Sequence, residues 1–309
     1  GDHRDLHSFP TRRLPIWHFV VNPTRSESGD HVGGIVGFLK SLGHLCTRTM
    51  PCRVIVVWEG GGSPRRRAID SGYKKGRRPI KLNRYYKGEI PDTVENRNSQ
   101  IANLISIISN VPVTQIYVDD CEADDVIAYL VKNKIKDKRV VIASSDRDLY
   151  QLLSKNVVQW SPGQKKFITI KDVKSKYGIS AVNFCTARCF VGDSSDGLKG
   201  VTLAGFASLS KRFKGLQEDS FLSVGDVVEL SKSALLQSKI KLFNNIVEQR
   251  GLAEKNWKLM FLDIRNLSHD QINKIKFSFE NPSINCNKLK TIKNISELGI
   301  KNFDIDSFF

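Results

Sequence analysis

Acidic residues are the minority charge class of this chain. Its 309 residues include 32 Asp and Glu against 48 Lys and Arg, which gives a formal net charge of +16. Such an excess indicates an anionic partner, either a nucleic acid or a membrane surface. We find no basic amphipathic helix of the kind that binds membrane surfaces, so nucleic acid is favoured.

Several other features are scarce or missing. No apolar run approaches a membrane span and no signal-peptide pattern is present, so we expect no membrane partner and a cytoplasmic location, in the host cell if the chain is viral. Cys185 and Cys189 lie four residues apart, but no second Cys or His pair could complete a zinc site. We expect all six cysteines to be buried thiols in a reducing compartment.

The N-terminal segment, residues 1–16, has neither apolar periodicity nor a strand pattern. Residues 1–13 read GDHRDLHSFPTRR. This segment resembles the translation of a sequencing-library adapter, and the match continues through Ile16 if one base is lost. Our hypothesis is that residues 1–16 are an assembly artefact joined to a truncated gene.

The remaining chain alternates between two apolar periodicities. Helical spacing predicts helices over 33–45, 93–110 and 123–132, and short β-branched runs predict strands over 53–58, 115–118 and 139–143. The alternation predicts an α/β fold, a mostly parallel sheet flanked by helices. From about Tyr177 the pattern is mostly helical. We therefore expect an α/β domain over 17–176 and an α-rich region over 177–309.

Seven of the 32 acidic residues gather in three short clusters. The clusters are Glu122, Asp124 and Asp125 in C-E-A-D-D, Asp146 and Asp148 in S-S-D-R-D-L, and Asp193 and Asp196 in G-D-S-S-D-G. The first two follow predicted strands, where open parallel sheets bind ligands. We expect Asp124 and Asp125 to open a helix, and strand alternation to point Asp146 and Asp148 the same way.

Carboxylate oxygens suit Mg²⁺ or Mn²⁺, and two such ions can support phosphodiester hydrolysis. Any single cluster could equally well cap a helix. Three clusters in a basic chain favour a metal-dependent nuclease.

A basic segment over 60–92 separates two of the predicted elements. It begins with three glycines and carries ten Lys or Arg between Arg65 and Lys87, with tyrosines among them. A solvated charged loop is the alternative, but interleaved aromatic residues favour contact with nucleic acid.

From residue 17 onward the chain resembles the 5′-nuclease family, which includes flap endonucleases, the 5′ exonuclease domain of bacterial DNA polymerase I and phage 5′ exonucleases. The likeness is greatest to the ribonuclease H branch of T-even-type phages. It rests on Tyr73-Lys74-x-x-Arg77, E-A-D-D, S-S-D-R-D-L and G-D-S-S-D-G-L-K-G-V.

The resemblance implies an α/β catalytic domain whose segment 60–92 forms a helical arch for a single-stranded 5′ end. It implies two ions of Mg²⁺ or Mn²⁺, the first bound by Glu122, Asp124, Asp146 and Asp148 and the second by Asp125, Asp193 and Asp196. Glu59 stands where the family has a further Asp. By the same resemblance Arg67 and Lys74 reach the scissile phosphate, Tyr73 stacks a terminal base and Arg77 binds DNA.

Residues 197–213 resemble the helix–three-turn–helix that grips duplex DNA through glycine amides and a potassium ion. The matching residues here are Gly200, Gly205 and Lys211. Gly197 replaces the usual Asn, and Phe206-Ala207-Ser208 replaces a Gly and a basic residue. The family's first metal-binding Asp would lie where the adapter-like segment stands, so we expect this chain to be impaired.

These features together predict a structure-selective 5′-nuclease that removes RNA primers or flaps during phage DNA replication. The expected substrates are 5′-flap, nicked or RNA-primed duplexes, and the expected state is a monomer. A PIN-like ribonuclease and a nucleic-acid-binding protein without catalysis are the alternatives. The tail N-F-D-I-D-S-F-F (302–309) resembles peptides that dock on sliding clamps; alternatively, Phe308 and Phe309 pack on the helical region.

Overall fold

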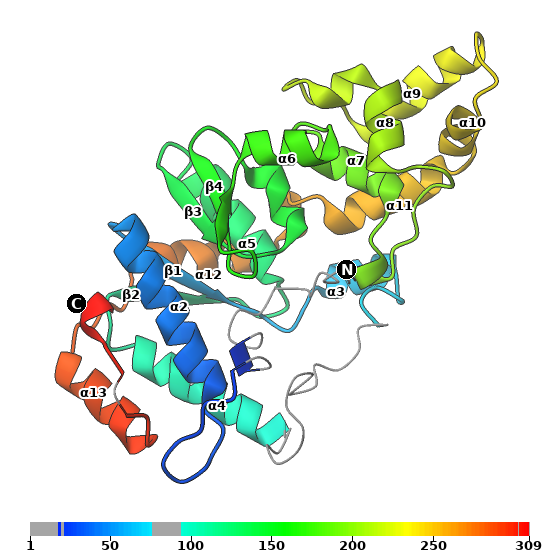
Figure 1. The fold of residues 1–309 in the computed structure, drawn as a ribbon. Helices are drawn as coiled ribbons and strands as arrows, with labels where there is room; N and C mark the ends of the chain where they lie inside the picture. Colours follow the sequence, from blue (N-terminus) through cyan, green and yellow to red (C-terminus); the bar gives the residue numbers. More distant parts are fainter. Residues whose placement is uncertain (1–17, 20–21, 76–93, 302, 309) are drawn as a thin grey trace, which may run out of the picture. The chain divides into compact units, whose positions relative to one another are not determined.

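The structure is a computed structural model that describes residues 18–19, 22–75, 94–301 and 303–308 (Figure 1). By their contacts the described residues form two compact units. The first unit comprises 61–75 and 120–268, and the second comprises the remaining described segments. The domains expected at 17–176 and 177–309 are regions of sequence, and that division stays a prediction. Each unit is described by itself.

The second unit is built on a two-stranded parallel sheet. Strand β1 (Val54–Trp58) pairs with β2 (Val113–Tyr117), with Val54 opposite Val113. Helices α2 (Gly33–Thr49) and α4 (Val94–Ile108) pack together, α13 (Lys288–Glu297) packs on α4, and α12 (His269–Glu280) packs on β2. The apolar spacing noted in the sequence supplies the buried faces of α2 and α4, and their side chains fill this unit's core.

The C-terminal segment belongs to the same core. Ile305 and Phe308 are buried in one cluster with Ile35 of α2, and the short helix η6 (Asp306–Phe308) packs on α2. Phe308 therefore packs on α2, a helix of the expected α/β domain, in addition to the C-terminal residues of the same cluster. Phe309 lies outside the described residues.

The first unit contains a three-stranded sheet and most of the described helices. Strand β3 (Val140–Ala143) runs parallel to β4 (Val157–Ser161), which pairs in antiparallel with β5 (Lys166–Ile168). Helix α5 (Ala123–Tyr129) continues as a π-helical turn, η1 (Leu130–Lys134). The other α-helices of this unit are α3 (Pro64–Ile69), α6 (Ile170–Tyr177), α7 (Phe184–Val191), α8 (Phe206–Arg212), α9 (Val224–Leu235), α10 (Lys241–Glu248) and α11 (Arg250–Met260).

The fold class expected from the sequence is confirmed. Each predicted helix and strand lies within a few residues of an observed one of the same type. Strands β4 and β5 were not predicted, and the described strands form two sheets instead of one. Among the residues that the structure describes, no helix combines the length and apolar character of a membrane span.

Acidification should destabilise the second unit through His18. Burial lowers the pKa of His18 from 6.5 to about 4. Between these two values the unfolded chain binds a proton that the folded chain does not, so stability falls as the pH drops from 6.5 to 4 and is fully present above 6.5. We expect a loss of about 2 kcal/mol between pH 8 and pH 5 in urea unfolding.

The variant His18→Gln should lose this part of the pH dependence, whereas His44→Gln, at an exposed position of α2, should retain it. Equal pH dependence in wild type and His18→Gln would contradict the assignment.

Candidate metal centre

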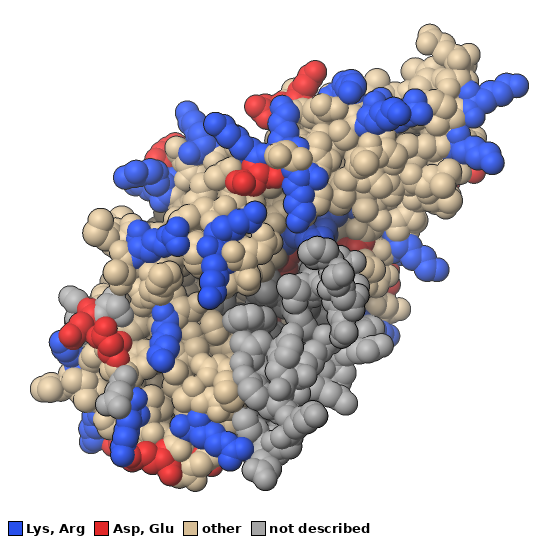
Figure 2. All heavy atoms as spheres, viewed as in Figure 1, with Lys and Arg blue, Asp and Glu red and all other residues tan. Residues whose placement is uncertain are grey.

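A small part of the acidic minority is buried. Lys and Arg side chains are spread over the face drawn in Figure 2, where Asp and Glu are fewer. In the first unit five carboxylates are at most 4 % exposed: Glu122, Asp124, Asp125, Asp148 and Asp196. Burying a carboxylate is costly unless a cation or hydrogen bonds accompany it. The cations that compensate these buried carboxylates therefore determine which ligands this region can bind.

The first cluster opens helix α5. Glu122 is the N-cap residue in an extended conformation, and Asp124 and Asp125 lie in the first turn. Free backbone N–H groups and the helix dipole favour negative charge at this end. The expected placement of Asp124 and Asp125 is confirmed.

A buried arginine from α3 holds two of these carboxylates. Arg66 is 1 % exposed. Its Nη1 donates to Glu122 Oε2 at 3.1 Å, and its two terminal nitrogens bind both oxygens of Asp125, with Nη2 to Oδ1 at 2.8 Å. Burial alone would lower the pKa of Arg66, but the hydrogen bond and charge of Asp125, with the charge of Glu122, raise it above its ordinary value.

Other contacts fix the Arg66 pair in place. Ser63 caps α3 by accepting a hydrogen bond from the Arg66 backbone N–H, and Arg66 Nε donates to the Leu259 carbonyl at 2.7 Å. Asn266 Nδ2 donates to Asp125 Oδ1 at 3.1 Å. The two charges are thus bound within a network that ties α3 to α5 and α11.

The turn after α3 reaches the same carboxylates. Lys74 Nζ forms an ion pair with Glu122 Oε1. The Lys74 backbone is left-handed (φ 60°), and its N–H donates to the Asp196 carbonyl at 3.2 Å. The Tyr73 ring is buried in the core, and its hydroxyl lies 3.5 Å from Glu122 Oε2. Residues expected to contact a phosphate and a base therefore contact the protein's own carboxylates here.

The second cluster lies on a short helix. We expected Asp146 and Asp148 on a strand end, and this is wrong because β3 ends at Ala143. Asp146 instead caps the 3₁₀ helix η2 (Arg147–Leu152), and its Oδ1 accepts the Asp148 N–H at 2.9 Å. The fully buried Gln159 of β4 holds this turn by donating to the carbonyls of Ser144 and Asp146 at 2.6 and 2.9 Å.

A second buried arginine joins this cluster to the third. Arg188 of α7 is 8 % exposed. Its Nε lies 2.9 Å from Asp148 Oδ1, and its Nη2 donates to Asp193 Oδ2 at 2.6 Å. Burial alone would lower the pKa of Arg188, but the charges of Asp148, Asp193 and Asp146 raise it above its ordinary value.

Two glycines shape the loop that carries Asp193 and Asp196. Gly192 has φ 81°, and a Cβ there would lie 2.5 Å from the Gly200 backbone nitrogen. A Cβ on Gly200 would lie 2.1 Å from the Val191 carbonyl oxygen. Only glycine permits this close approach of the loop to the end of α7.

One group of described residues meets the geometry for a single ion. Asp148, Asp193 and Asp196 each offer an oxygen, and these atoms lie within 4.8 Å of one another. Three carboxylates form a donor set that suits a hard divalent cation. The seven clustered carboxylates also outnumber Arg66, Lys74 and Arg188, so a further cation fits the charge of this region. The group combines one residue of the expected first metal set with two of the second.

Arg67, Glu59 and Arg77 were also predicted to belong to the site. Arg67 is exposed, and its Nη1 donates to the Gly61 carbonyl at 3.3 Å. Glu59 follows β1 in the second unit. Arg77 and most of the expected arch over 60–92 lie outside the described residues, and every one of these roles stays a prediction.

The predicted duplex-binding residues lie beyond the Asp193–Asp196 loop. Lys211 is exposed on α8, and the Gly205 N–H donates to Ser208 Oγ at 2.9 Å. Their contacts with DNA stay predictions.

Sequence reasoning missed the residues that hold the carboxylates. Arg66, Arg188, Gln159 and Asn266 were not singled out. Two of them carry a readable signal, because Arg188 is the charged residue of F-C-T-A-R-C-F-V and Gln159 is the polar residue of V-V-Q-W. A polar residue inside an apolar run needs a buried partner.

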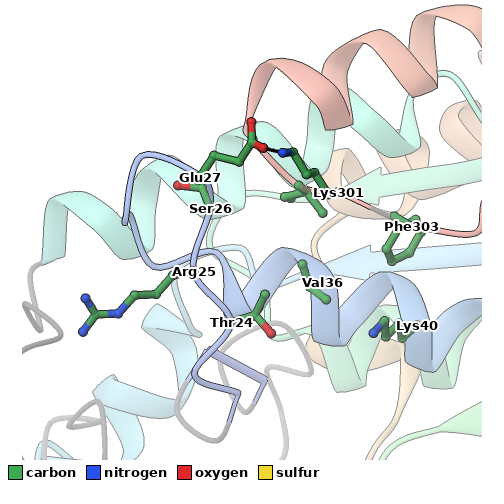
Figure 3. A pocket seen from close by; sticks show the side chains of 10 residues that line it. Thr24, Arg25, Ser26, Glu27, Val36, Lys40, Lys301 and Phe303 are labelled. Atoms are coloured by element: carbon green, nitrogen blue, oxygen red, sulfur yellow. Dashed lines mark ion pairs between the residues drawn. The ribbon is translucent and has the colours of Figure 1, made fainter.

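The second unit has a pocket of its own (Figure 3), with a volume of about 290 Å³. Its lining includes Arg25, Lys40 and the ion pair of Lys301 with Glu27. None of the predicted site residues lines it.

Removing the Arg66 charge should destabilise the first unit strongly. The variant Arg66→Met leaves Glu122 and Asp125 buried without their guanidinium partner. Breaking a buried ion pair in this way costs about 3–5 kcal/mol. Denaturant unfolding in metal-free buffer measures the loss.

The matched control is Arg67→Met, the exposed neighbour on the same helix, which should change stability by less than about 0.5 kcal/mol. Equal stability of the two variants would show that the buried pair is not what the geometry indicates.

The chain matches the family model described as "5'-3' exonuclease, N-terminal resolvase-like domain" over residues 13–178, more than half its length. It is 30% identical over 184 residues to a 5'-3' exonuclease of Aquifex aeolicus, covering 59% of each protein. It is 31% identical over 197 residues to the thermostable DNA polymerase I of Thermus thermophilus, covering 63% of this chain but 22% of the polymerase. The chain therefore spans less than two thirds of these relatives. For the flap endonuclease Xni of Shewanella woodyi, identity is 27%, with 69% of this chain and 75% of that protein covered.

Solved structures share the fold. The flap endonuclease of bacteriophage T5, in a pseudo-enzyme–product complex with DNA and metal ions, superposes with a TM-score of 0.64 at 18% identity, covering 80% of this chain and 90% of that one. A T5 5'-exonuclease with bound zinc gives a TM-score of 0.57 at 18% identity, covering 84% and 88%. With more than half its residues matching the family model, the chain belongs to the 5'-3' exonuclease family.

Proposed function

We propose that this chain is a metal-dependent, structure-selective 5′-nuclease acting on 5′-flap, nicked or RNA-primed duplex DNA. The observation that carries the proposal is the buried carboxylate region of the first unit, where Asp148, Asp193 and Asp196 could share one ion. Membership of the 5'-3' exonuclease family supplies the reaction class. The names of its relatives, exonuclease and flap endonuclease, support the substrate class.

The carboxylates would hold Mg²⁺ or Mn²⁺, two ions in the family pattern. Such ions make a water nucleophilic near neutral pH and neutralise charge on the scissile phosphate. Glu122, Asp124 and Asp146 would complete the set, with Asp125 and Glu59 as further ligands. A phosphate would draw Lys74 from Glu122 and bind Arg67, which is already exposed. The buried Tyr73 ring would have to emerge to stack a terminal base.

The loop 200–205 would grip duplex backbone, together with Lys211. Its shape is set by side chains of α10 and the residue that follows it: Gln249 Oε1 accepts the Thr202 N–H at 3.0 Å, and Asn245 Nδ2 donates to the Thr202 carbonyl at 2.9 Å. Leu203 is 61 % exposed in a left-handed conformation, φ 67°. A loop whose backbone is fixed by these hydrogen bonds suits contact with the regular backbone of a duplex, whether or not a potassium ion takes part.

The biological setting is a further part of the proposal. Removal of RNA primers during phage replication, by a monomer, follows from the sequence resemblance. Docking on a sliding clamp would require the tail to leave the core, because Ile305 and Phe308 are buried. A missing first-strand Asp would leave the chain impaired, which the experiment below also measures.

Cleavage of a 5′-labelled flap duplex tests the proposal, with flap binding recorded in the same samples. We expect Mg²⁺- or Mn²⁺-dependent cleavage that Asp146→Asn and Asp148→Asn each reduce by about 1,000-fold, since ion-stabilised transition-state charge contributes several kcal/mol. Asp219→Asn, an exposed loop carboxylate of the same unit, is the matched control and should cleave normally.

Flap binding without cleavage by wild type, at any concentration of either metal, would favour the non-catalytic alternative. Absence of both binding and cleavage in a folded sample would reject the function.

Charge on α8 gives a separate prediction about the duplex grip. Lys211→Gln should weaken duplex binding at all sequences and reduce the slope of log K against log salt by about 1. Lys239→Gln removes an exposed lysine outside 197–213 and should leave the slope unchanged. Identical slopes for both variants would remove Lys211 from the interface.

A further inference from the structure

Arg188 contacts the carboxylate group that is best arranged to bind an ion. Its guanidinium contacts Asp148 at 2.9 Å and Asp193 at 2.6 Å, two of the three carboxylates whose oxygens lie within 4.8 Å of one another. The side chain is 8 % exposed, so solvent screens these contacts weakly. An ion bound to the same oxygens would have to displace these contacts.

The carboxylates do not depend on Arg188 for their positions. Asp193 and Leu198 exchange both backbone hydrogen bonds at 2.8 Å, and Asp193 Oδ1 accepts the Ser195 N–H at 3.0 Å. Asp148 is fixed by the η2 turn, where its N–H donates to Asp146. Backbone geometry therefore places the acidic groups, and what Arg188 adds is positive charge.

Arg66 differs in this respect. Its Nε bonds the Leu259 carbonyl, so the side chain also joins α3 to the end of α11. Among the described residues, the Arg188 side chain forms its ion pairs with Asp148 and Asp193 alone. Of the two buried arginines, Arg188 is therefore the one whose role is concentrated on the candidate ion group.

We propose that Arg188 is a built-in cation that competes with a divalent ion for Asp148, Asp193 and Asp196. Arginine stays charged at any accessible pH, so the competition is permanent and cannot be relieved by deprotonation. The guanidinium compensates the carboxylates when no metal is present and weakens metal binding when metal arrives. The inference rests on the proposed function for the class of ion, a divalent metal. The competition by Arg188 sets the concentration of free metal that is needed to fill this group.

Binding of Mn²⁺ alone to the full chain, without DNA, tests the inference. Arg188→Met removes the charge and retains an unbranched side chain of good helix propensity. We expect the tightest Mn²⁺ site of this variant to bind at least tenfold more strongly than that of wild type by calorimetry. Arg188→Lys retains a charge that can contact one carboxylate at a time, so its affinity should fall between the two.

The control is Arg250→Met, an exposed arginine of α11 that pairs with Glu254, and its Mn²⁺ affinity should equal that of wild type. A second readout is thermal unfolding. Arg188→Met should melt below wild type in metal-free buffer and gain more than wild type on adding Mn²⁺, because preferential binding to the native state stabilises it.

Mn²⁺ affinity in Arg188→Met that is equal to or weaker than in wild type would overturn the inference. If Arg188→Met does not fold without metal, Arg188→Lys decides the question by the same criterion. Cleavage is not part of this test, so a chain that fails to cleave flaps but binds Mn²⁺ more tightly without Arg188 would reject the proposed function and retain the inference.

Discussion

Buried negative charge is the constraint on which the first unit depends. Five carboxylates with almost no exposure cannot be left to water, and two guanidiniums supply fixed positive charge beside them. Arg66 binds two carboxylates at the start of α5, whereas Arg188 bridges carboxylates from two different segments of the chain. The Arg66 pairs thereby join α3 to the start of α5, and the Arg188 pairs join the turn after β3 to the loop after α7. Ion pairs of this kind contribute less to net stability than to determining which groups can be neighbours.

Neutral polar groups set the geometry around these charges. Gln159 holds the turn that carries Asp146, Asn266 holds Asp125, and Gly192 with Gly200 brings the last loop against α7. Each of these residues contacts the backbone or a single carboxylate oxygen. The acidic groups are therefore held in position without a ligand. Preorganisation of this kind reduces the reorganisation that ligand binding would require.

Local patterns in the sequence were sufficient to predict most of the helices and strands of the α/β part and the acidic clusters, because both depend on neighbouring residues. The apolar spacing of 33–45 and the β-branched run at 53–58 each reflect one buried face. Strand β4 was not predicted because Gln159 interrupts its apolar run. Strand β5 was not predicted because three residues are too few to show an alternation of apolar and polar side chains. The arginine that pairs with Glu122 could not be predicted from the sequence. Arg66 lies 56 residues from Glu122 in the chain, and both neighbours of Arg66 are also arginines. Only burial distinguishes Arg66 from Arg65 and Arg67, and burial is a tertiary property.

The buried C-terminal segment has a consequence for the order in which the chain can fold. The core of the second unit joins α2, near residue 35, to Ile305 and Phe308, so it needs residues separated by most of the chain. The first unit is assembled from 61–75 and 120–268, and all of its segments leave the ribosome before that tail does. During synthesis the first unit can therefore close while α2 and α4 still lack part of their core. Long-range contacts of this kind form slowly, and the apolar faces of α2 and α4 stay exposed to aggregation until residues 305–308 have been synthesised.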